Sequence, residues 1–264
     1  MEARGGDVQH ALRVAGRRDK LAGVMAQLPR AILFDLDDTI LAAGQRPLVL
    51  LQVAGEFAGD MAPVRPEDLA DRLEIALVAF WSDPVRHKSA RFGITQARRQ
   101  VIAEAFAAMG EASLTPDLAD RFAARFTACR DEMTDFFPGA RAALEAVKAR
   151  GVLMALVTNG AADTQRAKIE RFDLAGLFDH IQIEGEHGFG KPETQAYLHA
   201  MSVLGVQAHE TWMIGDHLEW EVAAPQRLGI YAVWHDGFGV GLPADSPVRP
   251  DRIIRSLSEL LPGA

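Results

Sequence analysis

Short apolar runs that end in polar residues recur along the chain. The first run, residues 31–34, is wholly apolar and is followed at once by acidic residues. A similar run at 152–157 is followed by Thr158-Asn159-Gly160, and one at 211–214 by Gly215-Asp216. Two weaker runs occupy 180–183 and 230–234. An uninterrupted apolar run of this length is typical of a strand that is buried on both faces of a parallel sheet. We therefore predict strands at these five positions.

Between the predicted strands, apolar residues recur with a helical spacing. The clearest helical segments are residues 140–150, 163–172 and 194–204. Strands that alternate with helices indicate an α/β protein with a Rossmann-like open parallel sheet, in which ligands bind at the carboxyl ends of the strands. The polar residues that end the apolar runs are therefore the first candidates for a functional site.

Residues 47–136 interrupt this alternation, because they contain several helical segments and no convincing strand. Pro66 and Pro116 each mark a good helix start with acidic residues in the first turn, and Gly110 marks a helix end. We interpret residues 47–136 as an inserted helical cap domain.

The remaining residues divide into a core and an extension. Residues 31–46 and 137–264 hold all the predicted strands, so we assign them to the α/β core. Residues 1–30 carry a weak helical pattern and no candidate chemistry. We interpret them as an N-terminal extension that could be disordered, with Met25 as an alternative start.

Composition and charge narrow the function classes. The formal net charge of −8 and the lack of a long Lys/Arg run argue against a nucleic-acid partner. Cys129 is the only cysteine, which excludes an internal disulfide and a cysteine-based metal cage, and the eight histidines show no zinc-like spacing. No stretch has the roughly 18–20 apolar residues that a membrane span needs, and no signal peptide stands out. We expect a cytoplasmic protein without a membrane partner.

Two carboxylates stand two residues apart where the first predicted strand ends, in Asp35-Leu36-Asp37-Asp38-Thr39. A carboxylate is a competent covalent nucleophile, and a second one beside it can transfer a proton. Taken alone, however, an Asp-rich segment is equally typical of a capped turn between a strand and a loop.

The segment FDLDDTIL resembles the first motif of the haloacid dehalogenase superfamily, in the phosphatase branch with Asp-x-Asp-x-Thr. The later motifs of that superfamily are matched in order by Thr158 in LVTNG, Lys191 in GFGKPE and Asp216 in MIGDHLEWE. The resemblance covers residues 31–235, and the joint match is far more specific than any one motif. It implies a HAD-like hydrolase that cleaves a small-molecule phosphate monoester through an aspartyl-phosphate.

The resemblance also implies roles for individual residues. Asp35 would be the nucleophile and Asp37 the acid/base partner. The crowding of acidic groups around an anionic substrate calls for a cation, and oxygen ligands favour Mg²⁺. By the resemblance, Mg²⁺ takes a carboxylate oxygen of Asp35, the backbone carbonyl of Asp37 and a carboxylate oxygen of Asp216.

The substrate phosphate has its own set of implied ligands. The Thr158 hydroxyl would hold a phosphoryl oxygen, beside the backbone amides of Asn159 and Gly160, and Lys191 would supply a fixed positive charge. Positioning and charge neutralisation dominate phosphoryl transfer. We therefore count Thr158 and Lys191 with Asp35 and Asp37 as the expected catalytic residues.

One departure from the family pattern concerns the fourth motif, which commonly ends in a second Asp where this chain has Glu221. Glu221 could reach the metal through water, bond to Lys191 or face solvent. His217, directly after Asp216, is interpreted as a plain loop histidine rather than a contact to the leaving group.

Three other functions share the fold. A haloacid dehalogenase needs neither the second carboxylate nor the metal, so Asp37 and Asp216 argue against it. A sugar phosphomutase shares the motifs and stays an alternative, as does a non-catalytic phosphate-binding scaffold, since fold alone never establishes activity. We expect a monomer or a homodimer.

The cap is expected to close over the cleft and select the substrate. Its most basic stretch consists of Arg86, His87, Lys88 and Arg91. These residues could meet a second anionic group of the substrate, although we interpret them first as a solvated cap surface.

Overall fold

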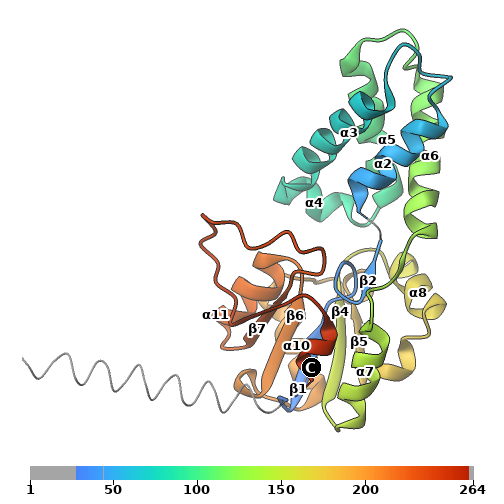
Figure 1. Ribbon diagram of the computed structural model, residues 1–264. Coiled ribbons are helices and arrows are strands. Elements are labelled where there is room, and N and C mark those ends of the chain that lie inside the picture. The colour runs from blue at the N-terminus through green and yellow to red at the C-terminus, as the bar shows by residue number, and fades with distance from the viewer. Residues whose placement is uncertain (1–27, 44, 262–264) are drawn as a thin grey trace, which may run out of the picture.

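The computed structural model describes residues 28–43 and 45–261, which form an α/β core and a helical domain beyond the carboxyl ends of the core strands (Figure 1). The core sheet is parallel throughout, in the order β5-β4-β1-β6-β7-β8. Its strands are β1 (Ala31–Phe34), β4 (Leu153–Thr158), β5 (His180–Ile183), β6 (Thr211–Gly215), β7 (Tyr231–His235) and β8 (Arg252–Ile254). The predicted Rossmann-like sheet is confirmed, and β8 is a strand that the apolar pattern did not predict.

The central strand β1 is buried on both faces, as its apolar run predicted. Ile32 and Phe34 pack into the cluster that contains α7, whereas Ala31 and Leu33 pack into the cluster on the opposite face, with α10 and α11. All four residues have no exposed surface. The helices of the core are α7 (Ala140–Ala149), α8 (Ala162–Arg171), α9 (Glu184–His187), α10 (Thr194–Leu204) and α11 (Ala224–Arg227). Short helical turns occupy Ala175–Leu177, Ala208–Glu210 and Leu257–Leu260, and a π-helical turn occupies Leu218–Ala223.

The helical domain has an apolar core of its own, built around Leu73, Phe106, Phe122 and Phe126. Its helices are α2 (Arg46–Glu56), α3 (Pro66–Trp81), α4 (Pro84–Ala90), α5 (Ile94–Met109) and α6 (Pro116–Glu132). The predicted helix starts at the prolines of α3 and α6 are confirmed, and α5 ends at Gly110 in the left-handed conformation, with φ of 69°. A residue without Cβ adopts this conformation at little cost. Cys129 is buried in α6.

The chain passes between the two domains through a pair of short strands. β2 (Leu41–Ala42) and β3 (Asp135–Phe136) pair antiparallel, with Leu41 opposite Phe136. No strand was expected near residue 136, because a two-residue strand has no periodicity and is held by its pairing alone. The prediction for the N-terminal extension falls, up to residue 27, outside the described residues. Among the helices that the structure describes, none is both long and apolar enough to cross a membrane.

Candidate active site

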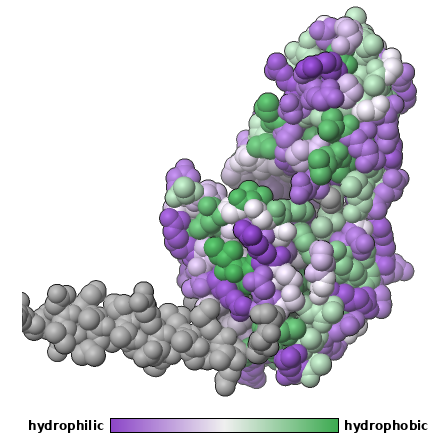
Figure 2. Space-filling view, in the orientation of Figure 1, coloured by the Kyte–Doolittle hydropathy of each residue, from purple (hydrophilic) through white to green (hydrophobic). Residues whose placement is uncertain are grey.

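A cavity of about 570 Å³ lies between the carboxyl ends of the core strands and the helical domain. The space-filling view is hollowed at this junction (Figure 2). Six of the seven residues expected at the site line it, namely Asp35, Asp37, Thr158, Asn159, Gly160 and Asp216. Lys191, the seventh, lies buried beside Asp35. Four segments far apart in the sequence therefore meet at one end of the sheet, as parallel strands require.

Asp35 is fixed at the end of β1 by three hydrogen bonds. Its Oδ1 accepts from Lys191 Nζ at 2.5 Å, and its Oδ2 accepts from the Thr39 hydroxyl at 3.0 Å. Its backbone amide donates to the Ile214 carbonyl at 2.9 Å, which continues the pairing of β1 with β6. The carboxylate is thus held in one orientation at the floor of the cavity, with 7% of the residue exposed.

Lys191 is a buried cation held between two carboxylates. Its Nζ lies 2.8 Å from Glu221 Oε1 as well as 2.5 Å from Asp35, and the side chains of Lys191 and Glu221 are each 1% exposed. Burial alone would lower the pKa of Lys191, but Asp35 and Glu221 outweigh it and raise that pKa above its usual value. Of the three roles considered for Glu221, the bond to Lys191 is the one observed.

Two close backbone approaches make this arrangement possible. The amide of Lys191 donates to Asn159 Oδ1 at 2.9 Å, and Asn159 Nδ2 donates to the Lys191 carbonyl at 2.7 Å. A Cβ on Gly190 would lie 2.6 Å from Asn159 Oδ1, and one on Gly215 would overlap Glu221 Cγ. Asn159 therefore positions the Lys191 backbone through its side chain, a contact that the motif alone did not suggest.

Asp37 is paired with a lysine that the sequence analysis did not single out. Lys168 Nζ lies 2.6 and 2.8 Å from the two carboxylate oxygens of Asp37, and Gln165 Nε2 donates to the same carboxylate at 2.9 Å. Burial tends to raise the pKa of Asp37, but the charge and hydrogen bonds of Lys168 and then Gln165 hold it below its usual value. The Asp37 side chain keeps 40% of its surface exposed to the cavity.

Gln165 also holds Thr158. Its Nε2 donates to Thr158 Oγ1 at 2.6 Å and to the Asn159 carbonyl at 2.9 Å. Gln165 and Lys168 stand three residues apart on α8, so they share one face of the helix that follows Thr158. The sequence could have pointed to both residues, because they stand three apart on a helix that begins just after the second motif.

The amide of Gly160 has a protein partner. It donates to Glu184 Oε2 at 3.1 Å, and the other oxygen of Glu184 pairs with Arg91 Nη2 from the helical domain. The Arg91 and Glu184 side chains are only 9% and 2% exposed. A phosphoryl oxygen would reach the Gly160 amide only by replacing Glu184 there.

Two further carboxylates of the site, those of Asp216 and Asp38, have raised pKa values. Burial and the charges of Asp35, Glu221 and Asp38 raise the pKa of Asp216 well above its usual value. Burial, opposed by Arg130 and reinforced by Asp37, raises the pKa of Asp38 to about 6. Carboxylate and carbonyl oxygens at such a site fit a hard cation such as Mg²⁺. Trp234 Nε1 donates to the Asp216 carbonyl at 2.5 Å and fixes the backbone there.

The four residues of the basic stretch on the helical domain lie in two different environments, the cavity and the protein surface. His87 and Arg91 line the cavity, where the His87 ring lies 4.8 Å from that of Trp220 in the core. Lys88 Nζ lies 2.9 Å from Glu193 of the core, and Arg86 lies 3.8 Å from Asp83 on the surface. The solvated-surface interpretation is therefore wrong for His87 and Arg91, because these side chains pack at the junction of the two domains.

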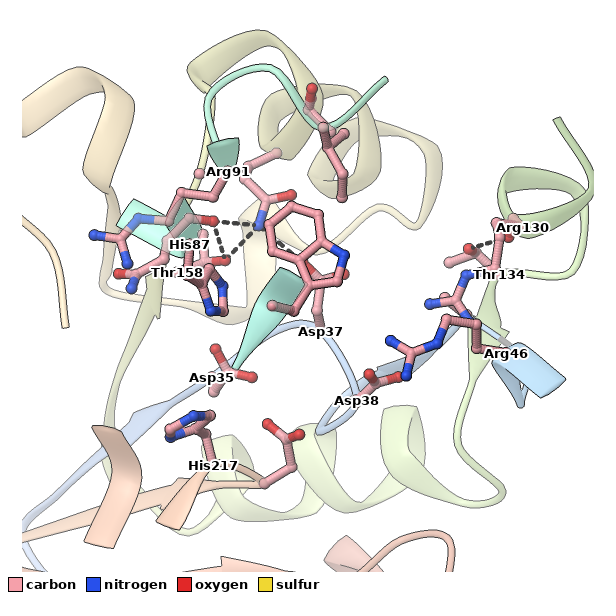
Figure 3. A pocket seen from close by; sticks show the side chains of 18 of the residues that line it. Asp35, Asp37, Asp38, Arg46, His87, Arg91, Arg130, Thr134, Thr158 and His217 are labelled. Atoms are coloured by element: carbon pink, nitrogen blue, oxygen red, sulfur yellow. Dashed lines mark hydrogen bonds between the residues drawn. The ribbon is translucent and has the colours of Figure 1, made fainter. Parts of the chain in front are cut away.

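Further arginines line the helical-domain side of the cavity. Arg46 and Arg130 lie on one side of the aspartates and Arg91 on the other (Figure 3). Arg98 completes the set, with its guanidinium 5.5 Å above the Phe126 ring. Burial, and then the charge of Arg130, lower the pKa of Arg98 to about 10. Arg46, Arg98 and Arg130 line the cavity from α2, α5 and α6, and Arg91 lines it from the end of α4.

Comparison with known proteins shows which families and folds this chain resembles. A family model described as haloacid dehalogenase-like hydrolase matches residues 29–229. The chain is 31% identical to the phosphoserine phosphatase of Thermus thermophilus over 250 residues, which cover 88% of this chain and 97% of that protein. It is 26% identical to the phosphoglycolate phosphatase of Pseudomonas putida over 241 residues, covering 89% and 80%. The magnesium-bound crystal structure of the HAD-hydrolase YfnB from Bacillus subtilis matches the fold with a TM-score of 0.67 at 21% identity, covering 89% and 97%.

Proposed function

This chain belongs to the haloacid dehalogenase-like hydrolases, and from that premise we propose a magnesium-dependent phosphatase that cleaves a small-molecule phosphate monoester through a phosphorylated Asp35. One observation carries the proposal. The Asp35 carboxylate is fixed by Lys191 and Thr39 at the floor of the cavity, two residues before a second carboxylate. This arrangement supports the proposal that Asp35 is the nucleophile and that Asp37, on the same short turn, carries the proton.

In the first half-reaction, Asp35 attacks the phosphorus atom and Asp37 gives a proton to the departing oxygen. Lys168 favours the ionised form of Asp37, which opposes this role in the free enzyme. A bound phosphate dianion adds negative charge beside Asp37 and so raises its pKa toward the range of a general acid. The Thr158 hydroxyl and the Lys191 ammonium would hold the phosphoryl oxygens during transfer.

In the second half-reaction, Asp37 accepts a proton from the water that attacks the phosphorylated Asp35. The Asp37 side chain is 40% exposed, so water can reach it, which favours hydrolysis over return of the phosphoryl group to a sugar hydroxyl. A phosphomutase has to keep water away from the same group.

Mg²⁺ would be held by Asp35, the Asp37 carbonyl and Asp216, and it would supply charge neutralisation for the phosphoryl group. The raised pKa of Asp216 supports this assignment, because buried acids that lack compensating charge are stabilised by a cation. The bound magnesium of the YfnB structure is consistent with it.

The arginines of the helical domain point to the substrate class. We infer that the leaving group carries a second negative charge, which Arg98 and Arg130 would meet across the cavity from Asp35. A charge-assisted hydrogen bond contributes about 1.5–3 kcal/mol. Arg98→Met and Arg130→Met should therefore lower kcat/KM for phosphoserine or phosphoglycolate about tenfold or more, and barely affect ethyl phosphate. Arg99→Met is the control, because Arg99 follows Arg98 on α5 but is exposed on the surface.

The primary test is phosphate release from para-nitrophenyl phosphate with and without Mg²⁺, using Asp35→Asn as the inactive reference. We expect turnover that requires the ion and that Asp35→Asn abolishes. Full turnover in excess chelator would contradict the proposed requirement for Mg²⁺. Transfer of phosphate between positions of a sugar phosphate, without release, would favour the phosphomutase.

A further inference from the structure

Three histidines from three different elements meet at the edge of the sheet, away from the cavity. His180 begins the edge strand β5, His187 ends α9 and His199 lies in α10. Their ring centroids lie 5.1 to 6.0 Å apart, and one nitrogen of each ring lies within 4.8 Å of one nitrogen of the others. All three side chains are partly buried. We refer to this group as the histidine cluster.

Hydrogen bonds fix which ring nitrogen carries the proton in two of these residues. His187 Nδ1 lies 3.1 Å from the Ile183 carbonyl oxygen, which can only accept, so Nδ1 holds the hydrogen. His199 Nδ1 lies 2.9 Å from Gln182 Oε1. The Gln182 amide nitrogen donates to the Ala196 carbonyl at 2.9 Å, so its oxygen must face His199. In the neutral rings of His187 and His199, Nε2 therefore keeps a free lone pair.

This arrangement is the one that orients metal-binding histidines in proteins, where the nitrogen remote from the metal donates to a carbonyl or carboxylate oxygen. Gln182 is 1% exposed, so its position is fixed by packing as well as by its hydrogen bonds. The hydrogen bonds that would orient the His187 and His199 rings toward an ion are therefore already formed.

His180 Nε2 is buried and has no hydrogen-bond partner among the described residues. A buried nitrogen left in this state costs free energy, and such groups in a native protein call for an explanation. Burial lowers the pKa of His180; a hydrogen bond with Gln182 opposes this effect, and the charges of His199 and His187 add to it, so the neutral ring is favoured. A neutral imidazole is the form that binds a metal ion.

We propose that His180, His187 and His199 bind one divalent transition-metal ion, such as Zn²⁺ or Co²⁺, through their Nε2 atoms. Three imidazole ligands suit these ions and not Mg²⁺, which prefers oxygen. Zn–N bonds of about 2.0–2.1 Å require nitrogens about 3.4 Å apart. The ring nitrogens lie within 4.8 Å of one another, so a small inward movement of the rings would complete the site. The fourth position would be filled by water.

The location gives such an ion a structural role. His187 and His199 stand on either side of the segment that carries Lys191, the one on α9 and the other on α10. An ion bound by both would fasten this segment at its two ends. The proposal does not depend on the phosphatase activity, because none of the three histidines lines the cavity.

The test measures ion binding to the full-length protein without a polyhistidine tag, in saturating Mg²⁺. Zn²⁺ would be followed by titration calorimetry, and Co²⁺ by the visible absorption that imidazole coordination gives it. We expect one ion per chain and a rise in Tm. His187→Gln and His199→Gln should each weaken binding at least about tenfold, and Gln182→Leu about 10–100-fold. His209→Gln, at an exposed histidine, should bind like the wild type.

Asp216→Asn separates this site from the proposed magnesium site. Unchanged Co²⁺ absorption in that variant supports the histidine cluster, whereas its loss there would overturn the proposal. Absence of stoichiometric binding to the wild type, or equal binding by the double variant His187→Gln/His199→Gln, would mean that the rings only pack against Phe189 and each other. Circular dichroism of the ion-free variants shows whether any loss comes from misfolding.

Discussion

The ammonium group of Lys168 lies 2.6 and 2.8 Å from the two carboxylate oxygens of Asp37. The proposed proton carrier of the reaction is thus bound to a cation that favours its ionised form. Under the proposed mechanism, Asp37 must therefore gain and lose a proton while Lys168 lies beside it.

Lys168→Met should shift the pH dependence of the first half-reaction. Burial raises the pKa of Asp37 and Lys168 lowers it, so removing Lys168 leaves the raising effect and the pKa increases. Asp37 acts as an acid only when protonated, so kcat/KM for an alkyl phosphate should begin to fall at a higher pH in the variant. The pH profile measures this, with Lys148→Met, an exposed lysine on α7, as the control. A profile that stays in place would argue against Asp37 as the acid.

Asp37→Asn should still accept phosphate from an activated ester, because such a leaving group needs no proton. General acid–base help is worth about 10²–10⁴-fold, so breakdown of the phosphorylated enzyme should slow accordingly. Rapid-quench mass spectrometry should find phosphate on Asp35 in this variant and none in Asp35→Asn. Phosphate on any residue other than Asp35, or continued turnover with no labelled residue, would show that the nucleophile is wrongly assigned.

Asp216→Asn and Glu221→Gln should differ in their dependence on Mg²⁺. Of these two residues, only Asp216 is proposed as a Mg²⁺ ligand, so its variant should need at least about tenfold more Mg²⁺ for half-maximal activity. Glu221→Gln removes a countercharge of Lys191, at 2.8 Å, and should lower kcat with little change in Mg²⁺ demand. Activity measured across a Mg²⁺ titration separates the two effects, and equal shifts would contradict the ligand assignment.

Gly190→Ala should damage the site, whereas Gly176→Ala should not. A methyl group on Gly190 would lie 2.6 Å from Asn159 Oδ1, and nothing lies within 4 Å of the same position on Gly176. Overpacking of this kind costs about 1–3 kcal/mol and would displace Asn159 from the Lys191 backbone. Chemical denaturation and kcat should both report the loss. Equal stability of the two variants would indicate that the Lys191 segment can move freely.

The elements predicted best were those with a strong local signal. The β1 run is apolar at every position because both faces of the strand are buried, and that burial is what the structure has. The motif residues were identified by their resemblance to a known family, and the parallel sheet explains why they meet, since the carboxyl ends of its strands lie at one edge. By contrast, β8 has an exposed Ile253 and follows a long irregular segment, so its sequence carries little strand signal.

The contacts that the sequence did not reveal join residues distant in the chain. Lys168 and Asp37 are 131 residues apart, and Arg91 and Glu184 are 93 apart. Only the folded chain brings them together, and nothing in the local pattern of either residue distinguishes it from a surface charge. The histidine cluster was not predicted for the same reason, because its three residues come from three elements and have no regular spacing in the sequence.

The pairing of β2 with β3 has a consequence for how this protein could change over time. Leu41 lies opposite Phe136, so the helical domain leaves and re-enters the core at adjacent points. Residues 43–134 therefore connect two paired strands, as the loop of a β-hairpin does. A change in the length of such a connection costs little loop-closure entropy. Insertions and substitutions in the helical domain can therefore accumulate while core residues that line the cavity, such as Asp35 and Thr158, keep their positions.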